Sequence, residues 1–525
     1  MEIFRLNNLY IRDNDIFKKE ITFDFSQDKD KISLEVPYLT LIIGVNGTGK
    51  SYLLKLLIDI FRLALDKKKE SESIYYPSGK YNLEYVLGNS VYNIGNTISP
   101  KDKSEKVNYF EKDKKEDKGI RFWKNGNEVS SSSIEIPKSI LALSIMLTDK
   151  YLFLKEPQKF PIYKYLGVRR DNNTAGTRSF IGKTIDNIYA ALGNEAFLEN
   201  LSEMLSFLEL SNEFHISYLP RYKEHFFSPN LTEEKFEDFF LNNKKYLPRR
   251  TTEPWSVATF KQLKETQPEI IPKLVDLLHH LTRKLICFEN SRSQYFIFDI
   301  FDIKPSLQKL LPLLPYLHSL NIISYPEIRV KKGRHYKIGE SSSGEYHFIS
   351  TIVGLLATIT DNSLVLIDEP EISLHPNWQM KYVAFLNKIF KKYNSVHFLI
   401  CSHSHFLVSD LKAENSSIIS LKREDWETKA TSIKTNTFGW SAEEVLLEVF
   451  NVPTTRNLYV YEKLGEILDI IALRDTNERV VSENKFTFEV KKRINELQDL
   501  GIDSLSNEDP LKEVIEKLIE KYGRS

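Results

Sequence analysis

Residues 38–51 read YLTLIIGVNGTGKS, an apolar run followed by a glycine-rich turn. The apolar run predicts a buried strand, and residues 52–65, YLLKLLIDIFRLAL, predict a helix directly after the turn. The turn matches the phosphate-binding pattern GxxxxGK[ST] without a mismatch, in the strand and helix context that the pattern requires. This stretch therefore predicts a nucleotide-binding α/β fold.

Each part of the turn has a chemical role in holding a nucleoside triphosphate. The glycines let backbone N–H groups approach the phosphates, and the dipole of the following helix adds to the attraction. We expect Lys50 to reach the β- and γ-phosphates and Ser51 to bind Mg²⁺. The predicted ligands are ATP and Mg²⁺, and the predicted binding residues are Gly44, Asn46, Gly47, Gly49, Lys50 and Ser51.

A second apolar strand, SLVLID at 363–368, ends in an acid and is followed by another. A parallel strand delivers Asp368 to the C-terminal edge of the sheet, where it can hold Mg²⁺ through water. Glu369 is then free to polarise the attacking water, which favours hydrolysis over simple binding. A third apolar strand, SVHFLICS at 395–402, precedes His403. Strands separated by helices predict a parallel sheet.

Ser342-Ser343-Gly344-Glu345 opens a predicted helix ahead of the acidic strand. It resembles the signature of ATP-binding-cassette ATPases, commonly LSGGQ or LSGGE, with Ser341 in place of leucine and Ser343 in place of the first glycine. The resemblance implies that these four residues face the nucleotide of the opposite subunit. Residues 401–406, CSHSHF, resemble the THSP-like switch of the same superfamily. This resemblance implies a γ-phosphate contact and a catalytic role for His403, whereas His405 stands at the usual proline and is expected to pack.

Residues 368–376, DEPEISLHP, resemble the overcoming-lysogenization-defect ATPases, recombination mediators and phage-defence ATPases. Residues 437–444, TFGWSAEE, resemble the ATPase subunit of Septu-type and retron-associated antiphage systems. That resemblance implies an HNH-type nuclease as partner. One phosphate-binding turn and one signature per chain predict a head-to-tail homodimer, alone or within a higher oligomer, whose closure by ATP would regulate the nuclease. In a retron, a reverse transcriptase and its nucleic-acid product would be further partners.

Lys50 and Asp368 lie far apart in sequence, so the ATPase head is expected to be split by an insertion. The fold class is an α/β head with a mostly parallel sheet, helices on both faces and N-terminal antiparallel strands. The expected parts are an N-terminal head segment, a mainly helical insertion, a C-terminal head segment with signature, acids and His403, and a helical tail for partner or oligomer contact. They span 1–153, 154–322, 323–435 and 436–525. No glutamine sensor is evident after 139–147, and Gln158 is the remaining candidate.

The composition excludes several classes of binding site and cellular location. The 525 residues hold 72 Lys plus Arg and 72 Asp plus Glu, which excludes a uniformly basic nucleic-acid coat. Cys287 and Cys401 form no CxxC pair, so a disulfide framework and a cysteine-rich zinc site are excluded. The apolar run at 349–360 is shorter than the ~18 residues of a membrane span. We expect a soluble, cytoplasmic protein without membrane contact.

Three basic clusters are candidates for contact with DNA or RNA. They are Lys164, Arg169, Arg170, Arg178 and Lys183; Lys244, Lys245, Arg249 and Arg250; and Arg329, Lys331, Lys332, Arg334 and Lys337. The first is favoured because Tyr163 and Tyr165 interleave stacking surfaces with it. The last 120 residues contain no DxD, and no HNH or HExxH pattern occurs, so any nuclease is expected in another protein.

Two stretches have competing interpretations. The polar residues 66–133 are expected to form a solvated insertion, because their interleaved charges cancel the field of a nucleic-acid-binding arm. An apolar stripe near the C-terminus predicts either packing on the chain's own core or docking of a partner. Its residues are Leu511, Val514, Ile515, Leu518, Ile519 and Tyr522.

Three other functions remain open on the sequence. A DNA-repair ATPase related to recombination mediators or condensin heads would bind DNA without a nuclease partner, although long coiled-coil heptads are missing. A transporter or translation cassette would carry paired heads or a complete signature. An ATP-sensing scaffold would keep Lys50 and Ser51 but could do without Glu369.

Overall fold

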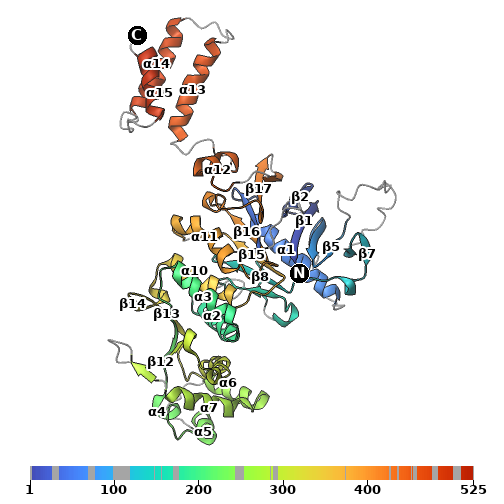
Figure 1. The fold of residues 1–525 in the computed structure, drawn as a ribbon, viewed down its shortest axis with the longest axis vertical. Helices are drawn as coiled ribbons and strands as arrows, with labels where there is room; N and C mark the ends of the chain where they lie inside the picture. Colours follow the sequence, from blue (N-terminus) through green and yellow to red (C-terminus); the bar gives the residue numbers. More distant parts are fainter. Residues whose placement is uncertain are drawn as a thin grey trace. The chain divides into compact units, whose positions relative to one another are not determined.

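The computed structural model forms two compact units, Met1–Gly439 and Trp440–Ser525 (Figure 1). No helix in the described part of the chain is long and apolar enough to cross a bilayer. The described residues are 3–26, 35–68, 77–97, 119–146, 148–154, 157–169, 177–242, 254–283, 285–287, 294–372, 374–424, 427–433, 437–450, 452, 458–475, 483–499 and 510–523.

A seven-stranded sheet is the centre of the first unit. Its order is β18-β17-β3-β16-β15-β8-β9, and only the edge strand β18 is antiparallel to its neighbour. The strands are β3 (Tyr38–Gly44), β8 (Ser139–Ser144), β9 (Tyr163–Tyr165), β15 (Ser363–Asp368), β16 (His397–Ser402), β17 (Ser416–Glu424) and β18 (Glu427–Ile433). The predicted parallel α/β sheet is confirmed.

A six-stranded antiparallel sheet, in the order β2-β1-β4-β5-β6-β7, forms the N-terminal layer. Its strands are β1 (Phe4–Arg12), β2 (Ile21–Asp24), β4 (Lys80–Leu87), β5 (Ser90–Gly95), β6 (Arg121–Lys124) and β7 (Asn127–Val129). The prediction of a solvated insertion over 66–133 is wrong where this stretch is described, because Leu83, Tyr85 and Ile94 alternate into the core. Residues 101–118 lie outside the described residues.

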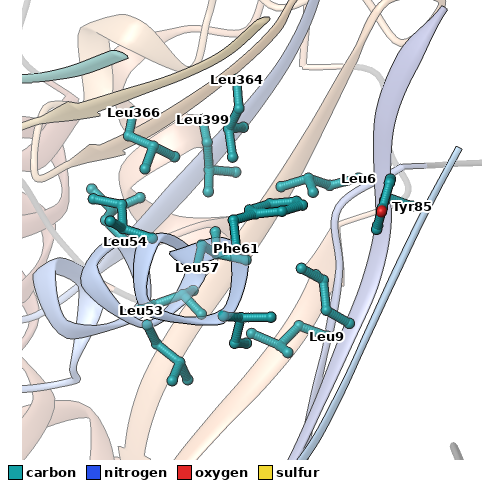
Figure 2. Packing of buried hydrophobic residues seen from close by; sticks show 14 of the residues in the cluster. Leu6, Leu9, Leu53, Leu54, Leu57, Phe61, Tyr85, Leu364, Leu366 and Leu399 are labelled. Atoms are coloured by element: carbon teal, nitrogen blue, oxygen red, sulfur yellow. The ribbon is translucent and has the colours of Figure 1, made fainter. Parts of the chain in front are cut away.

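Helix α1 (Lys50–Lys68) packs between the two sheets (Figure 2). Leu53, Leu57 and Phe61 line the helix face of this core. Leu6 and Leu9 come from β1, and Leu364, Leu366 and Leu399 come from the parallel sheet. The Phe61 ring lies 5.4 Å from that of Tyr85, between ring centroids. Since α1 begins at Lys50, this core fixes the helix that follows the phosphate-binding turn.

The opposite face of the parallel sheet is covered by α10 (Ser343–Leu356) and α11 (Pro376–Ile389). Ile367 of β15 and Leu143 of β8 line a small cavity with Phe348 of α10 and Tyr382 of α11. Helices α2 (Thr177–Ala191) and α3 (Glu195–Phe207) contact α10, and α3 also contacts α11. Side chains of β15 therefore alternate between the two helical layers.

The stretch expected to be a mainly helical insertion also contains strands. Helices α4 (Lys223–Phe226), α5 (Glu233–Asn242), α6 (Trp255–Thr266), α7 (Ile270–Thr282), α8 (Pro305–Gln308) and α9 (Leu314–Ser319) lie beside β10 (Phe214–Tyr218), β11 (Leu285–Cys287) and β12 (Gln294–Asp299). With β13 (Glu327–Lys332) and β14 (Arg334–Lys337), these strands form an antiparallel sheet in the order β11-β12-β10-β13-β14. Helical spacing at 306–317 is broken by Pro312 and Pro315 into short elements.

The second unit is helical, with α12 (Ala442–Glu448), α13 (Leu458–Asp475), α14 (Glu483–Asp499) and α15 (Pro510–Leu518). Ile467, Val490 and Ile494 form its core with Ile515. Other residues of the predicted C-terminal stripe pack on the same core, whereas Val514 is 44% exposed. The stripe thus packs mainly on its own unit, as the first of its two interpretations expected.

Phe61→Ala tests whether one core joins the two sheets. We expect the free energy of unfolding of the first unit to fall by about 3–5 kcal/mol, because the substitution leaves a cavity between rings and helix. Urea unfolding followed by circular dichroism measures it. Trp255→Ala is the control, since this side chain is 65% exposed. An equal loss in the two variants would contradict the shared core.

Candidate active site

The phosphate-binding turn joins the end of β3 to the start of α1 and depends on its glycines. Gly47 and Gly49 have φ values of 82° and 93°, a region that favours glycine. At Gly44 an added Cβ would lie 2.5 Å from the carbonyl oxygen of Leu421 on β17. Gly44 therefore has no room for a side chain, and a turn built on glycines suits the approach of phosphate to backbone N–H groups.

Lys50 is almost fully buried at the first position of α1. Its Nζ donates to the carbonyl oxygen of Gly44 at 2.8 Å and lies 2.8 Å from Nε2 of His403. Burial lowers the pKa of Lys50, and the negative charges of Glu369 and Asp368 partly oppose this. The structure thus brings together the predicted lysine, the switch histidine and the two acids at the C-terminal edge of the sheet.

Asp368 ends β15, and its side chain hydrogen-bonds with that of Ser51. The residue is 1% exposed, and burial raises the pKa of its carboxyl to about 7. Its Oδ1 atom is buried without a hydrogen-bond partner among the described residues. A hydroxyl beside an orphaned carboxylate oxygen is the donor set that Mg²⁺ takes in nucleotide sites, so the residues present fit this ion.

Glu369 and Lys50 lie on either side of the same imidazole nitrogen. Nε2 of His403 is 3.2 Å from Oε1 of Glu369 and 2.8 Å from Nζ of Lys50. A protonated Nε2 donates to Glu369, whereas an unprotonated Nε2 accepts from Lys50, so one tautomer cannot make both bonds. The hydrogen bond from His403 lowers the pKa of Glu369. The tautomer of His403 therefore decides whether its Nε2 bonds to Glu369 or to Lys50.

Glu371 is a part of the site that sequence reasoning missed. Its Oε1 accepts from the Ser402 hydroxyl at 2.8 Å and from the His403 N–H at 2.5 Å. Its Oε2 is buried without a partner in the described structure. The sequence offered one signal for Glu371, which is its position as the third acid of the DEPE motif. Glu371 fixes the backbone that presents His403.

The signature serines lie at the start of α10 and are exposed. Ser342 is the N-cap, and its hydroxyl accepts from the N–H of Glu345 at 3.2 Å. Oε1 of Glu345 accepts from the Tyr336 hydroxyl at 2.8 Å. Gly344 is buried. These contacts stay within the signature segment and β14 and do not include Lys50, so the described structure does not join the two predicted half-sites within the chain.

The segments after β8 and β9 are joined by a buried ion pair. Arg169 contacts Asp149 at 2.5 Å between Nη2 and Oδ1, with side chains 8% and 0% exposed. The Tyr165 hydroxyl also donates to Asp149, at 2.7 Å. Asp149 raises the pKa of Asp368, so the pair is electrically coupled to the site. Gln158 is exposed on a short 3-10 helix at Pro157–Lys159.

The favoured basic cluster is thus partly structural. Arg169 is committed to Asp149, and Tyr163 is buried with its hydroxyl donating to Leu152. The expected stacking role of this tyrosine is wrong, because its ring stacks on Phe160 instead. Arg170, the side chain of Arg178 and the whole second cluster lie outside the described residues. In the third cluster, Lys331, Lys332 and Lys337 pair with glutamates.

Comparison with known proteins identifies the family of the chain. The model of the AAA ATPase domain matches residues 6–408, and the chain therefore belongs to that family. The predicted hydrolysis of ATP is confirmed at this level.

Two relatives carry the names expected from the sequence. A "Retron Vc95 probable ATPase" of Vibrio cholerae serotype O1 biovar El Tor is 21% identical over 84% of this chain and 79% of its own length. The "Septu protein PtuA" of Bacillus thuringiensis is 23% identical over 31% of this chain and 37% of its own. The predicted resemblance to ATPases of these two systems is confirmed. An SMC head domain from Thermotoga maritima aligns at a TM-score of 0.34, with 11% identity, over 82% of this chain and 100% of that chain.

Arg169→Met tests the buried ion pair. We expect a loss of about 3–5 kcal/mol in the free energy of unfolding, because the Asp149 carboxylate is left buried and uncompensated. Adding Asp149→Asn should recover part of this loss, as measured by urea unfolding. The matched control is Arg334→Met, at an exposed arginine of the third cluster. If the loss in free energy of unfolding is no larger than that of the control, the ion pair contributes no more to stability than an exposed arginine does.

Proposed function

We propose that the chain is the ATP-hydrolysing subunit of an antiphage defence complex and works as a head-to-tail homodimer gated by ATP. The observation that carries the dimer is the separation of the half-sites. Lys50, Asp368, Glu369 and His403 meet at one edge of the sheet, whereas Ser342 and Ser343 are exposed at the start of α10. A second copy can supply its exposed serines to the first copy's nucleotide.

In this proposal Lys50 exchanges its partners when ATP binds. Its Nζ now donates to carbonyl oxygens of Gly44 and Val45. Phosphate oxygens are stronger acceptors than carbonyls, so they draw the ammonium away from the turn. Ser51 and Asp368 would hold Mg²⁺, which would neutralise charge on the phosphates. The backbone N–H groups of the turn complete the cradle.

Glu369 is the proposed base that takes the proton from water. Its lowered pKa keeps it ionised, and His403 holds it through Nε2. When Lys50 turns to phosphate, Nε2 is released from the competition between the ammonium and the carboxylate. His403 can then bond either Glu369 or the γ-phosphate. Turnover and closure of the dimer are thereby linked through one imidazole.

The defence role is supported by the relatives' names and by the sequence. The Vibrio relative aligns over most of both chains, and the Septu protein over a smaller part. The nuclease of the complex is proposed to be a separate HNH-type protein, regulated by closure of the ATPase dimer. A reverse transcriptase and its product would join if the chain belongs to a retron. The cytoplasm is its proposed location.

The pH profile of ATP turnover tests the coupling of His403 to Glu369. Since the hydrogen bond from His403 lowers the pKa of Glu369, His403→Ala should raise it. The acidic limb of turnover should therefore move to higher pH, because the base protonates earlier as pH falls. Steady-state phosphate release between pH 5 and pH 9 measures this shift. Glu369→Gln should lower turnover by about 10²-fold or more and leave ATP binding intact.

His405→Ala is the matched control, since His405 lies two residues after His403 and its ring packs on that of Phe406. Its acidic limb should coincide with that of the parent protein. If the acidic limb of the pH profile does not move in His403→Ala, the group that titrates there is not Glu369. Unchanged turnover in Glu369→Gln would remove it from catalysis altogether.

Mixing two inactive variants tests the head-to-tail dimer. Lys50→Ala and Ser342→Arg should each abolish turnover alone. A mixed dimer has one intact pair, Lys50 of one protomer and Ser342 of the other, so turnover should return. A theoretical limit is about one half of parent activity, because purification through both tags selects mixed dimers and each mixed dimer has one working site of two. Co-expressed tagged variants purified in tandem provide the sample.

The same two variants can be tested for protection from phage in cells that also carry the genes beside the gene of this chain. Plaque counts should fall with the parent chain, rise with either variant, and fall again when both are expressed. No rescue of turnover would contradict composite sites. Rescue of turnover without any protection from phage would contradict the defence role, and stimulation by DNA without a nuclease partner would favour a repair ATPase.

A further inference from the structure

One face of the five-stranded sheet gathers histidines and a carboxylate away from the ATPase site. His215 of β10 pairs with Arg329 of β13, and Lys331 of β13 pairs with His335 of β14. Glu213 lies two residues before His215. Residues two apart on a strand share a face, and directly paired residues do too. Glu213, His215 and His335 therefore lie together on one face.

The contacts within this group are close. Nε2 of His335 is 2.8 Å from Oε2 of Glu213. The two imidazole rings stack with centroids 4.9 Å apart and planes inclined by 19°. One ligand atom from each of the three residues lies within 4.8 Å of the other two. The three side chains thus converge on a common volume.

His215 has an unused donor or acceptor there. Its Nδ1 is buried and has no hydrogen-bond partner among the described residues. Its Nε2 lies 3.8 Å from Oδ2 of Asp299, longer than a hydrogen bond. A buried ring nitrogen without a partner costs stability unless something else binds it. A lone pair on this nitrogen can be used by a metal ion.

Lys331 orients the carboxylate without occupying it fully. Its Nζ donates to Oε1 of Glu213 at 2.7 Å, which leaves Oε2 directed at His335. Carboxylates and histidines that bind metals are commonly fixed by such outer partners. Asp299 supplies a second negative charge beside His215. The group therefore offers two imidazoles, one oriented carboxylate and a nearby acid.

We propose that Glu213, His215 and His335 bind a divalent transition-metal ion of the Zn²⁺ type. Two imidazoles and a carboxylate suit zinc and its neighbours better than Mg²⁺ or Ca²⁺, which prefer oxygen. Zinc lies ~2.0–2.1 Å from such ligands, so bound ligand atoms cannot be more than about 4 Å apart. Small side-chain shifts would close the site, and the His335 side chain is partly exposed, at 31%.

The ion would tie β10 to β14 across β13. This matters because β14 leads through a short 3-10 helix, Ile338–Glu340, to Ser342 and α10 (Figure 1). Tyr336, next to His335 on β14, donates to Glu345 in the first turn of α10. A bound ion thus fixes the strand that carries the signature. This site is independent of the proposed function, since none of its residues belongs to the nucleotide site.

Calorimetric titration with ZnCl₂ tests the proposal on the full chain after removal of metals by a chelator. The parent protein should bind one more equivalent of Zn²⁺ than His215→Ala or His335→Ala. The affinity of the parent protein for this Zn²⁺ ion should exceed that of either variant by about 100-fold, since loss of even an outer partner of a metal site lowers metal affinity by about 10–100-fold. Zn²⁺ should also raise the melting temperature of the parent more than that of either variant.

Three further variants make the result specific. His280→Ala removes another exposed imidazole that faces a single carboxylate, with Nδ1 3.7 Å from Oδ1 of Asp276, and should leave the titration unchanged. Asp368→Asn removes the carboxylate proposed to hold an ion in the nucleotide site, and so separates any binding there from binding at the histidines. Glu213→Gln keeps the side-chain shape and should weaken binding if the histidine variants fail to fold. Equal Zn²⁺ binding in the parent, His215→Ala and Glu213→Gln would overturn the site.

Discussion

The parallel pairing of β3, β16 and β15 is the constraint on which the rest of the structure depends. Its register sets Ile43 opposite Ser402 and Asp368 opposite Cys401. Three strand ends therefore reach the same edge, and the residues that follow them meet. A slip of one residue would reverse the side chains of a strand buried on both faces, so the packing on α1 and α10 holds this register. The contact between Lys50 and His403 follows from it.

The same edge concentrates charge that the protein does not neutralise fully. Burial lowers the pKa of Lys50 and raises that of Asp368 to about 7. Both shifts show that the charged forms lack the solvation they would have in water. Glu371 and Asp368 each keep a buried oxygen without a partner in the described residues. Such a site is suited to a ligand that brings both negative phosphates and a divalent cation.

Sequence alone predicted the phosphate-binding turn, the acids and His403 because each follows an apolar strand directly. It also predicted β15 to the residue, since both faces of that strand are buried. It predicted the N-terminal antiparallel strands, but it missed β4 to β7 of the same layer, where polar outer residues hid the alternation of Leu83, Tyr85 and Ile94. The Asp149–Arg169 pair and Glu371 could not be found from spacing, because their partners are set by tertiary contacts.

Glu369 shows how the sheet sustains a costly local geometry. Its φ is 50°, the left-handed region that L-residues other than Asn and Asp rarely adopt. Its N–H nevertheless donates to the carbonyl oxygen of Cys401 at 2.9 Å, so the β15–β16 pairing continues through it. A glycine would relieve the conformation but would remove the carboxylate that faces His403. The strain at Glu369 costs about 1–3 kcal/mol, and such strained residues cluster at functional sites, which is consistent with the proposed role of this carboxylate.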